Sequence, residues 1–404
     1  MPDDFAAAWA RLDAEPWLTA ALARIPRMEP WIRRQQLAVA AIAAPTGGEG
    51  LRAEWMLAQF TALGLEAGLD VVGNVLARMP ARIRGGANRR QILITAHMDT
   101  AFPPGTAMTP QPEGRIWRGP GIGDNAAGLA ALLALARLTA EAQLDPRHWP
   151  FRFAANVGEE GEGDLRGMRH LFSGAEAGQI AHTLVLDGPG QGLTTRALGS
   201  RRFQVEITGP GGHSWADAGA ASAIHALARV AERLLRRARN ELGVAACNIG
   251  QISGGGAINA VAPAASMKVD LRAAEASRLE QLAEELRAAV EEGVAEENRQ
   301  ARSGAVTGRL ESLGERPAAA LPRAAPLRAA LEQVEERLGM THADTLASTD
   351  ANVPLALGRS AVRLGAGGRG GGAHSMQEWF DPAGRAPALR RALLLMALLA
   401  EAGI

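Results

Sequence analysis

The sequence predicts an α/β protein built on a mostly parallel, mixed sheet flanked by helices, into which a smaller α+β domain is inserted. Apolar segments at 91–96, 151–157 and 182–186 alternate with helical patterns, which is typical of a largely parallel sheet covered on both faces. Beyond residue 198 the pattern changes, because 202–208 alternates with a period of two and so resembles a strand with one exposed face. The 404 residues also favour two domains over one.

The first part of the chain, about 7–63, is predicted to form helices separated by proline and glycine, with a clear break at APTGGEG. Strands are expected at 71–79 and 91–96. The run NAAGLAALLALARLTAEA then predicts a helix, and Asp124 stands where its N-cap belongs. Strands at 151–157 and 182–186 follow.

Beyond residue 198 the predicted elements follow the order β-α-β-β-α-β, which is the split-βαβ pattern of a small α+β domain. Its elements are a strand at 202–208, a helix at 220–240, strands at 248–253 and 265–271, a helix at 278–297 and a strand at 306–313. The segment RPAAALPRAAP leads back to the first domain, which continues with a strand at 361–364 and ends in a helix from about 387. We therefore expect a sheet-containing host domain formed by 1–196 and 317–404, interrupted by an inserted domain at 197–316.

Composition excludes several function classes. Lys plus Arg and Asp plus Glu number 43 each, so the basic surface that nucleic acid or an anionic membrane requires is missing. The N-terminus has acids where a signal peptide has basic residues, and the most apolar stretch is too short to cross a bilayer. The single cysteine, Cys247, fits a reducing compartment, so a cytoplasmic location is expected.

Two segments contain metal-binding residue types, one after a buried strand and one before a helix. His97 and Asp99 follow the strand at 91–96, where Asp99 can accept a hydrogen bond from the far ring nitrogen of His97. A histidine satisfied at a strand end is the alternative. Asp124 lies in GPGIGDNAAG, where glycines allow the backbone to approach another group and the carboxylate can bridge two ions. A simple N-cap is the alternative there.

Further candidates follow later strands on the same predicted edge. Glu159 and Glu160 are adjacent, and on extended backbone their side chains point in different directions. This favours one glutamate as a metal ligand and the other as the residue that contacts the attacking water. Asp187 ends the strand at 182–186, and His374 follows the strand at 361–364. The potential ligands are therefore His97, His374, Asp124, Asp187 and one of the two glutamates. Two histidines and three carboxylates form a ligand set suited to Zn²⁺, with Mn²⁺ or Co²⁺ as alternatives. The remaining histidines are interpreted as structural or surface residues: His148, His170, His182, His225 and His342.

The succession of motifs resembles the M20 family of metallopeptidases, in particular its glutamate carboxypeptidase and peptidase T-like branches. The motifs are H-x-D, G-x-G-D-N, G-E-E-G, a strand ending in Asp, G-G-H-S and G-G-x-H-S-x-x-E-W, in that order. The resemblance covers nearly the whole chain. It implies an aminoacylase-like catalytic domain and a small lid domain through which two chains form a homodimer.

The resemblance also implies a role for each residue of the cluster. His97 and Asp187 would hold one zinc ion, Glu160 and His374 the other, and Asp124 would bridge them. Asp99 would support His97, and Glu159 would be the general base. The segment GDNAAG departs from the family, in which D-D/M-K-G is the more frequent run after the bridging Asp. The surroundings of Asn125 are therefore expected to differ from those in the family.

In the predicted lid, three further residues match family positions. His213 in GGHSW matches a histidine that reaches the neighbouring subunit's active site and stabilises the oxyanion. Asn259 and Arg272 match substrate-binding positions, with Arg272 on a substrate carboxylate.

The expected function is hydrolysis of amide bonds by metal-activated water, most simply as an exopeptidase on small peptides. An N-acyl-amino-acid deacylase or a carbamoylase is the alternative within enzymes. An inactive metal-binding or ligand-binding homologue is the alternative outside them, although such a protein has no use for Glu159.

Overall fold

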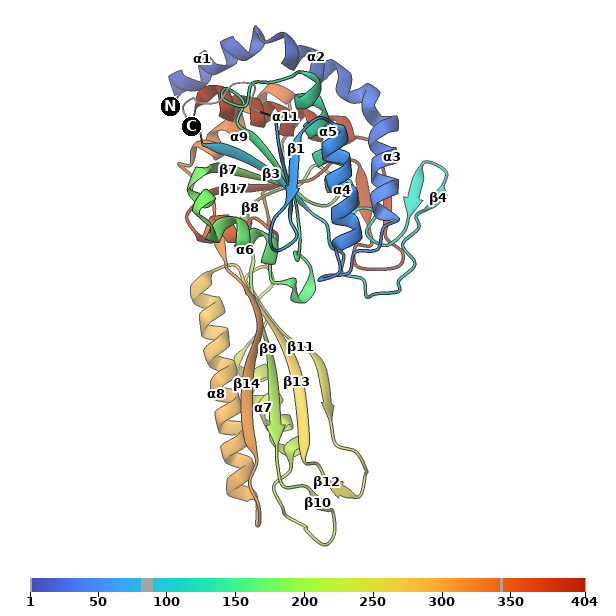
Figure 1. Ribbon diagram of the computed structural model, residues 1–404. Helices are drawn as coiled ribbons and strands as arrows, with labels where there is room; N and C mark the ends of the chain where they lie inside the picture. The colour runs from blue at the N-terminus through green and yellow to red at the C-terminus, as the bar shows by residue number, and fades with distance from the viewer. Residues whose placement is uncertain (1, 81–89, 342–343, 404) are drawn as a thin grey trace. The chain divides into compact units, whose positions relative to one another are not determined.

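The computed structural model describes residues 2–80, 90–341 and 344–403 (Figure 1). The chain divides into two compact units, one made of the residues up to Arg196 and from Ala320 onward, the other of Ala197–Ala319.

The first unit contains a large mixed sheet. Its four central strands run parallel in the order β6-β3-β7-β17, and the pairs β1/β2, β2/β6 and β17/β8 are antiparallel. The predicted fold class is confirmed. In spatial order the strands are β1 (Glu66–Leu69), β2 (Val75–Arg78), β6 (Phe151–Asn156), β3 (Gln91–His97), β7 (Ile180–Leu186), β17 (Ser360–Leu364), β8 (Leu193–Ala197) and β15 (Ala319–Ala320), with β16 (Asp344–Ala347) also paired to β8.

Helices cover both faces of this sheet. Nearly all residues of β3, β6 and β7 are buried, which explains their largely apolar sequences. On one face, α6 packs against Leu93 and Ala154; on the other, α5 contacts β3, β6 and β7. The helices of this unit are α1 (Pro2–Asp13), α2 (Pro16–Arg24), α3 (Glu29–Ala40), α4 (Gly50–Ala62), α5 (Ala126–Glu141), α6 (Arg166–Ser173), α9 (Pro326–Leu338), α10 (Asn352–Ala356) and α11 (Arg385–Ala402), with short 3-10 turns at Ile25–Met28, Gly161–Gly163 and Ala175–Gln179.

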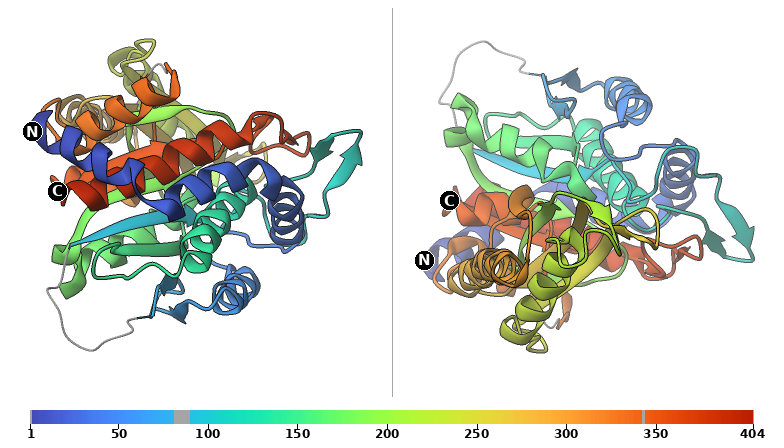
Figure 2. Two further views of the ribbon diagram at one scale, coloured as in Figure 1. Left: turned by 90° about the horizontal axis from the view of Figure 1, so that it is seen from above. Right: turned by 90° about the horizontal axis from the view of Figure 1, so that it is seen from below.

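Helix α5 is apolar on every side because it lies inside the molecule. Thirteen of its residues are buried, and it contacts α3 and α11 as well as the sheet. A helix that is hydrophobic all round belongs in a core. Helix α11 lies beside α1 (Figure 2) and also contacts α5. Helices from the first and last parts of the chain therefore pack together.

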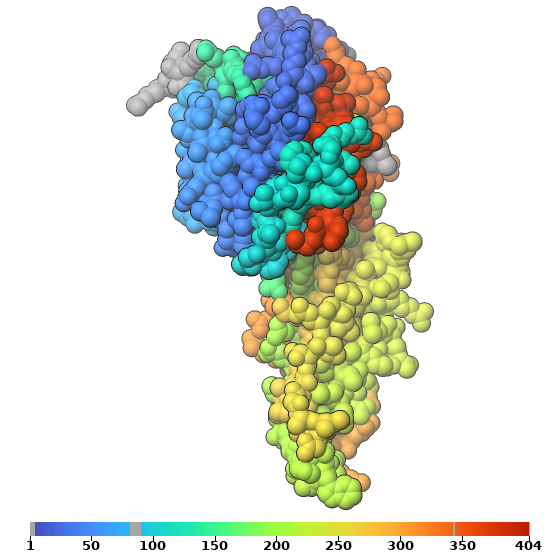
Figure 3. Space-filling view, turned by 90° about the vertical axis from the view of Figure 1, so that its right-hand side faces the viewer, coloured from blue at the N-terminus to red at the C-terminus, as the bar shows by residue number. Residues whose placement is uncertain are grey.

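A small sheet that the sequence did not predict joins two distant loops. Its strands are β4 (Gln111–Glu113), β5 (Ile116–Arg118), β18 (Arg369–Gly371) and β19 (Trp379–Asp381), in the order β18-β19-β5-β4. In Figure 3 the teal hairpin of β4 and β5 lies against the red C-terminal segment. The pairing of β5 with β19 brings together the segments that precede Asp124 and follow His374.

The second unit contains a four-stranded antiparallel sheet in the order β11-β13-β9-β14, with α7 and α8 packed on it (Figure 1). The predicted β-α-β-β-α-β order agrees with this arrangement. The elements are β9 (Gly199–Thr208), α7 (Ala223–Arg237), β11 (Ala245–Gly254), β13 (Ala264–Ala273), α8 (Ala276–Gln300) and β14 (Thr307–Arg316), and a two-stranded pair is formed by β10 (Gly212–His213) and β12 (Ala260–Val261).

The core of this unit explains its sequence patterns. Alternate residues of β9, Phe203, Val205 and Ile207, are buried, as the period of two predicted. They meet buried side chains of α7 and α8, which recur at helical spacing. At the contact between the helices, a Cβ on Gly293 would lie 2.7 Å from Val230, so glycine permits the close approach.

The structure differs from the sequence-based expectations in detail. The strand expected at 71–79 is only Val75–Arg78, because residues 71–73 form the turn that follows β1. Among the described residues, no helix has the length and apolarity needed to cross a membrane.

Candidate metal centre

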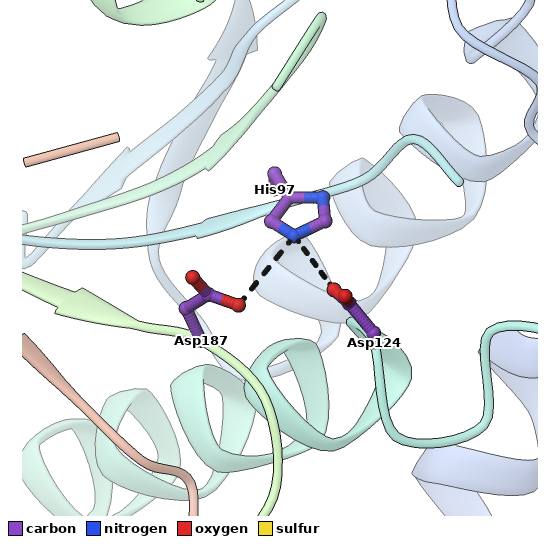
Figure 4. A group of neighbouring side chains, drawn as sticks. All are labelled: His97, Asp124 and Asp187. Carbon is purple, nitrogen blue, oxygen red and sulfur yellow. Dashed lines mark hydrogen bonds and ion pairs between the residues drawn. The ribbon is translucent and has the colours of Figure 1, made fainter. Parts of the chain in front are cut away.

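His97 and Asp187 lie at the same edge of the large sheet. His97 is the last residue of β3, and Asp187 directly follows β7. The two strands are parallel neighbours, with Thr95 paired to Val185, so both side chains lie two residues beyond one register position. His97 Nε2 and Asp187 Oδ1 are 3.8 Å apart (Figure 4).

Asp124 approaches His97 from the loop before α5. Its Oδ1 lies 3.1 Å from His97 Nε2 (Figure 4). The predicted N-cap role of Asp124 is wrong: the N-cap is Asn125, whose side chain accepts the N–H of Gly128 at 3.1 Å. Asn125 also donates to the carbonyl of Leu186, the residue before Asp187, at 3.0 Å. The carboxylate of Asp124 therefore faces the histidine.

The second oxygen of Asp124 faces another histidine. His374 Nε2 lies 3.3 Å from Asp124 Oδ2 and 2.9 Å from Glu160 Oε1. Asp124 thus belongs to two groups of potential ligands, one with His97 and Asp187 and one with Glu160 and His374, and within each group the ligand atoms lie within 4.8 Å of one another. The five side chains proposed as ligands converge.

Glu159 stands beside both groups. It forms a third set with His97 and Glu160, again within 4.8 Å, and it is 5% exposed. Glu159 comes after the end of β6 and is preceded by Gly158. The φ of Gly158 is +68°, which would strain any residue with a Cβ. The turn therefore places two consecutive glutamates at the edge where His97 ends its strand.

Asp99 makes different contacts from those the sequence predicted. The nearest acceptor for His97 Nδ1 is the backbone carbonyl of Asp99, at 3.1 Å, and the carboxylate oxygen Oδ1 is 3.6 Å away. Either contact favours a proton on Nδ1, which leaves Nε2 as the ligand atom. The carboxylate of Asp99 accepts the N–H of Glu159 at 2.9 Å, the N–H of Glu160 at 2.7 Å and the hydroxyl of Thr46 at 2.9 Å.

Electrostatics show that this cluster attracts positive charge. Hydrogen bonds to Asp124 and Glu160 raise the pKa of His374 to about 10. Burial opposes a charge on His97, yet the carboxylates of Asp124, Asp187 and Asp99 raise its pKa well above the ordinary value. Burial also opposes ionisation of Asp124, but His374 and His97 lower its pKa. A negatively charged group of carboxylates with two imidazoles offers the donors that suit a divalent cation.

Comparison with protein families assigns most of this sequence to one of them. Residues 93–402 match the model of the peptidase family M20/M25/M40. The chain belongs to this family. As an M20 protein, it is a hydrolase of the peptidase and amidohydrolase type.

Solved structures share the fold of this M20 hydrolase at low identity. A tripeptidase from Staphylococcus aureus has a TM-score of 0.73 and 20% identity, over 91% of this chain and 98% of that one. The aminopeptidase PepT from Bacillus cereus has a TM-score of 0.68 and 21% identity, over 92% and 98%. A hydantoinase/carbamoylase family amidase from Burkholderia ambifaria has a TM-score of 0.58 and 18% identity, over 94% and 97%. Among curated proteins, none matches the chain by sequence.

Glu378 is a site residue that sequence reasoning missed, although it belongs to the M20-like motif around His374. Its carboxylate accepts the backbone N–H groups of Gly121, Gly123 and Asp124 at 2.7, 2.7 and 2.8 Å. Burial raises its pKa to about 7 in spite of these hydrogen bonds. Glu378 thus ties the loop of Asp124 to the loop of His374.

Asp350 and Asn156 are two further residues near the cluster of this M20 hydrolase that the sequence did not indicate; Asn156 is paired with His97 in the sheet. Asn156, at the end of β6, accepts from the hydroxyl of Thr95 and donates to Asp350 Oδ2 at 2.7 Å. Asp350 is fully buried, and burial raises its pKa to about 7. No sequence motif pointed to Asp350.

Glu49, in the APTGGEG segment, supports the turn that carries Glu159. It accepts the N–H of Gly47 at 3.0 Å and that of Gly158 at 3.1 Å, and it pairs with Arg166. The segment that sequence reasoning treated as a break therefore contacts the site, through both Glu49 and Thr46.

The remaining candidates of the M20 resemblance lie in the second unit. His213 is exposed on β10, and its Nδ1 accepts the N–H groups of Trp215 and Ala216 at 3.2 and 3.3 Å. Asn259 is exposed, and its carbonyl accepts the N–H of Ser214 at 2.9 Å. Arg272 donates to Asp270 at 2.7 Å.

The other described histidines and the cysteine belong to none of the three groups of potential ligands. His182 is buried in β7, and His225 is exposed on α7. His148 pairs with Glu401, and His170 lies 3.8 Å from Asp70, while His342 is outside the described residues. Cys247 is buried, as predicted, and burial raises the pKa of its thiol to about 11, which disfavours a nucleophilic role.

Proposed function

We propose that this chain is a dinuclear zinc exopeptidase that hydrolyses small peptides. The observation that carries the proposal is the position of Asp124, whose two oxygens face His97 and His374 at 3.1 and 3.3 Å. A carboxylate between two imidazoles, each with a further carboxylate beside it, is the arrangement that two cations sharing one bridging ligand require.

In this proposal His97 and Asp187 bind one cation, and Glu160 and His374 bind the other. Nitrogen and oxygen donors favour zinc, and Co²⁺ or Mn²⁺ are the alternatives. When bound, such cations lower the pKa of water to about 7 and polarise a carbonyl oxygen. Asp99 fixes the tautomer of His97 through Nδ1 and holds the backbone of both glutamates.

Glu159 is the proposed general base. Its position within 4.8 Å of ligand atoms of His97 and Glu160 supports this role. Its carboxylate would take a proton from the attacking water and deliver it to the leaving amine nitrogen. A base placed in this way contributes about 10²–10⁴-fold to the rate.

His213 is proposed to donate a hydrogen bond to the oxyanion of the substrate. Because its Nδ1 accepts two backbone N–H groups, the proton of the neutral ring is on Nε2, which is then the donor. In the proposed homodimer, 197–316 is the lid and dimerisation domain, and His213 acts in the partner's active site. Asn259 and Arg272 would bind substrate. A single cysteine supports a cytoplasmic location.

The peptide substrate is supported by likeness to a tripeptidase and to the aminopeptidase PepT, which have higher TM-scores than the carbamoylase-family amidase. The amidase keeps a second candidate open, namely an N-carbamoyl or N-acyl amino acid. Both substrates present an amide carbonyl to the same cluster.

Zinc analysis combined with a substrate panel tests the proposal. Purified protein would be assayed for metal content and then tested on dipeptides, tripeptides, N-acetyl amino acids and N-carbamoyl amino acids, with Glu159→Gln as the inactive control. We expect two metals per chain and release of a terminal residue from peptides. Turnover of only the N-carbamoyl or N-acetyl compounds would establish the second candidate. No bound metal and no turnover on any amide would refute both.

A further inference from the structure

Arg363 places a positive charge beside one half of the cluster. It lies in β17, next to β7, and its Nε is 3.8 Å from Asp187 Oδ2. Asp187 Oδ1 is in turn 3.8 Å from His97 Nε2. The carboxylate of Asp187 thus lies between a histidine of the cluster and an arginine.

The guanidinium occupies a defined position. The Arg363 side chain is 17% exposed, and its Nε is buried and makes no hydrogen bond to the described residues. Its two terminal nitrogens lie against Gly188 and Gly192, where a Cβ would come within 2.8 and 2.9 Å of them. Glycines on both sides therefore leave room for the guanidinium in the loop that follows Asp187.

Among the described residues, no arginine forms an ion pair with the other half of the cluster. Within the described part of the chain, the ion pairs of Glu160 and of Asp124 are made with the two histidines and with no arginine. Arg363 also lies near another positive side chain, since its charge lowers the pKa of Arg391, after the larger effect of burial. Asp187 is the carboxylate that balances Arg363.

We propose that Arg363 makes the half-site of His97 and Asp187 the weaker of the two cation sites, so that the metals load in sequence. A cation bound there is repelled by the guanidinium, and Asp187 must divide its charge between the two. The half-site of Glu160 and His374 is free of this competition. Coulomb repulsion at this range predicts a difference on the order of tenfold in affinity. The inference rests on the proposed two-cation site.

Zinc titration of metal-free protein against a competing chromophoric chelator tests this. Wild type should give one tight and one weak dissociation constant. Arg363→Met should tighten the weak constant about tenfold and change the tight one less than threefold, whereas Arg363→Lys, which keeps the charge, should resemble wild type. Arg369→Met is the matched control, because Arg369 is an exposed arginine of the same unit that pairs with Asp381.

Asp187→Asn identifies the half-site, because it should abolish the weak constant and leave the tight one. If Arg363→Met does not fold, as judged by its thermal transition, Arg363→Gln replaces it. Equal constants in wild type, or weaker zinc binding in the neutral variants, would overturn this inference alone. Absence of zinc binding by wild type would overturn the proposed function as well.

Discussion

Glu378 Oε1 accepts the backbone N–H of Asp124 at 2.8 Å. The same carboxylate accepts two more N–H groups of that loop, and the carbonyl of Glu378 accepts the N–H of Gly119 at 2.9 Å. Glu378 is four residues beyond His374. One short segment therefore supplies a histidine to the cluster and holds the loop that presents the proposed bridging carboxylate.

Replacing Glu378 should disturb the cation site without removing a ligand. Glu378→Ala leaves three backbone N–H groups without an acceptor, which costs about 1–3 kcal/mol for each group left unsatisfied. We expect metal affinity to fall about 10–100-fold and the melting temperature to drop. Metal titration and thermal denaturation measure the two effects. Glu162→Ala, an exposed change in the same unit, is the control, and an unchanged metal affinity in Glu378→Ala would refute the positioning role.

Glu159→Gln should separate catalysis from metal binding. The amide keeps the size of the side chain but cannot take a proton from water, so turnover should fall about 10²–10⁴-fold. Metal content should match wild type, because the proposed ligands are unchanged. Steady-state rates and elemental analysis of the same preparation test this. A variant that retained its rate would exclude Glu159 as the base.

His374→Ala should remove about one metal per chain. The proposed second cation then retains only Glu160 and the shared Asp124, while the half-site of His97 and Asp187 keeps all its donors. Metal content after extensive dialysis is the measurement. His225→Ala, which changes an exposed histidine of the second unit, serves as the control. Two retained metals would show that His374 is not a ligand.

Zinc affinity should rise with pH. The carboxylates raise the pKa of His374 to about 10 and that of His97 above its ordinary value, so protons compete with a cation for both rings. A cation must displace each proton, and below those pKa values the affinity rises up to about tenfold per pH unit for each proton released. Dissociation constants at pH 6, 7 and 8 measure the slope, which should be smaller in His374→Ala. A pH-independent constant would contradict this account.

Mixed dimers test whether His213 acts on the partner chain. Neither His213→Ala nor Glu159→Gln should be active alone. If His213 serves the neighbouring site, a mixture that exchanges subunits contains one site with both residues intact, and activity should recover to roughly a quarter of wild type or less. Covalently linked heterodimers provide the control for exchange. Absence of recovery in linked heterodimers would exclude action in trans.

The sequence predicted the parts of the site that follow buried strands. His97 ends β3, Asp187 directly follows β7 and Glu160 lies four residues beyond β6. These strands are largely apolar, and parallel strands end at one edge. The sheet itself was predictable for the same reason. Apart from β2, its short antiparallel margins and the small sheet of β4, β5, β18 and β19 were not, since strands of two to five residues carry little periodicity.

Supporting contacts could not be inferred in the same way. Glu378 accepts backbone N–H groups about 255 residues away along the chain, and backbone donors leave no mark in the sequence. Asp124 and Asn125 are both plausible N-caps, so the sequence could not decide which side chain faces the helix. The structure assigns the cap to Asn125 and leaves Asp124 for the cluster.

Strand β17 lies between β7 and β8 in the sheet, although it is made after both and after the whole second unit. During synthesis on the ribosome, the edge of β7 that pairs with β17 therefore stays without its partner strand until Ser360–Leu364 has emerged. Arg363 arrives with that segment, and His374 follows it. The nascent chain therefore gains β17, the proposed ligand His374 and the positive charge of Arg363 in one late step. A product terminated before this segment has an unpaired strand edge, which can pair with other chains, and it lacks one proposed metal ligand.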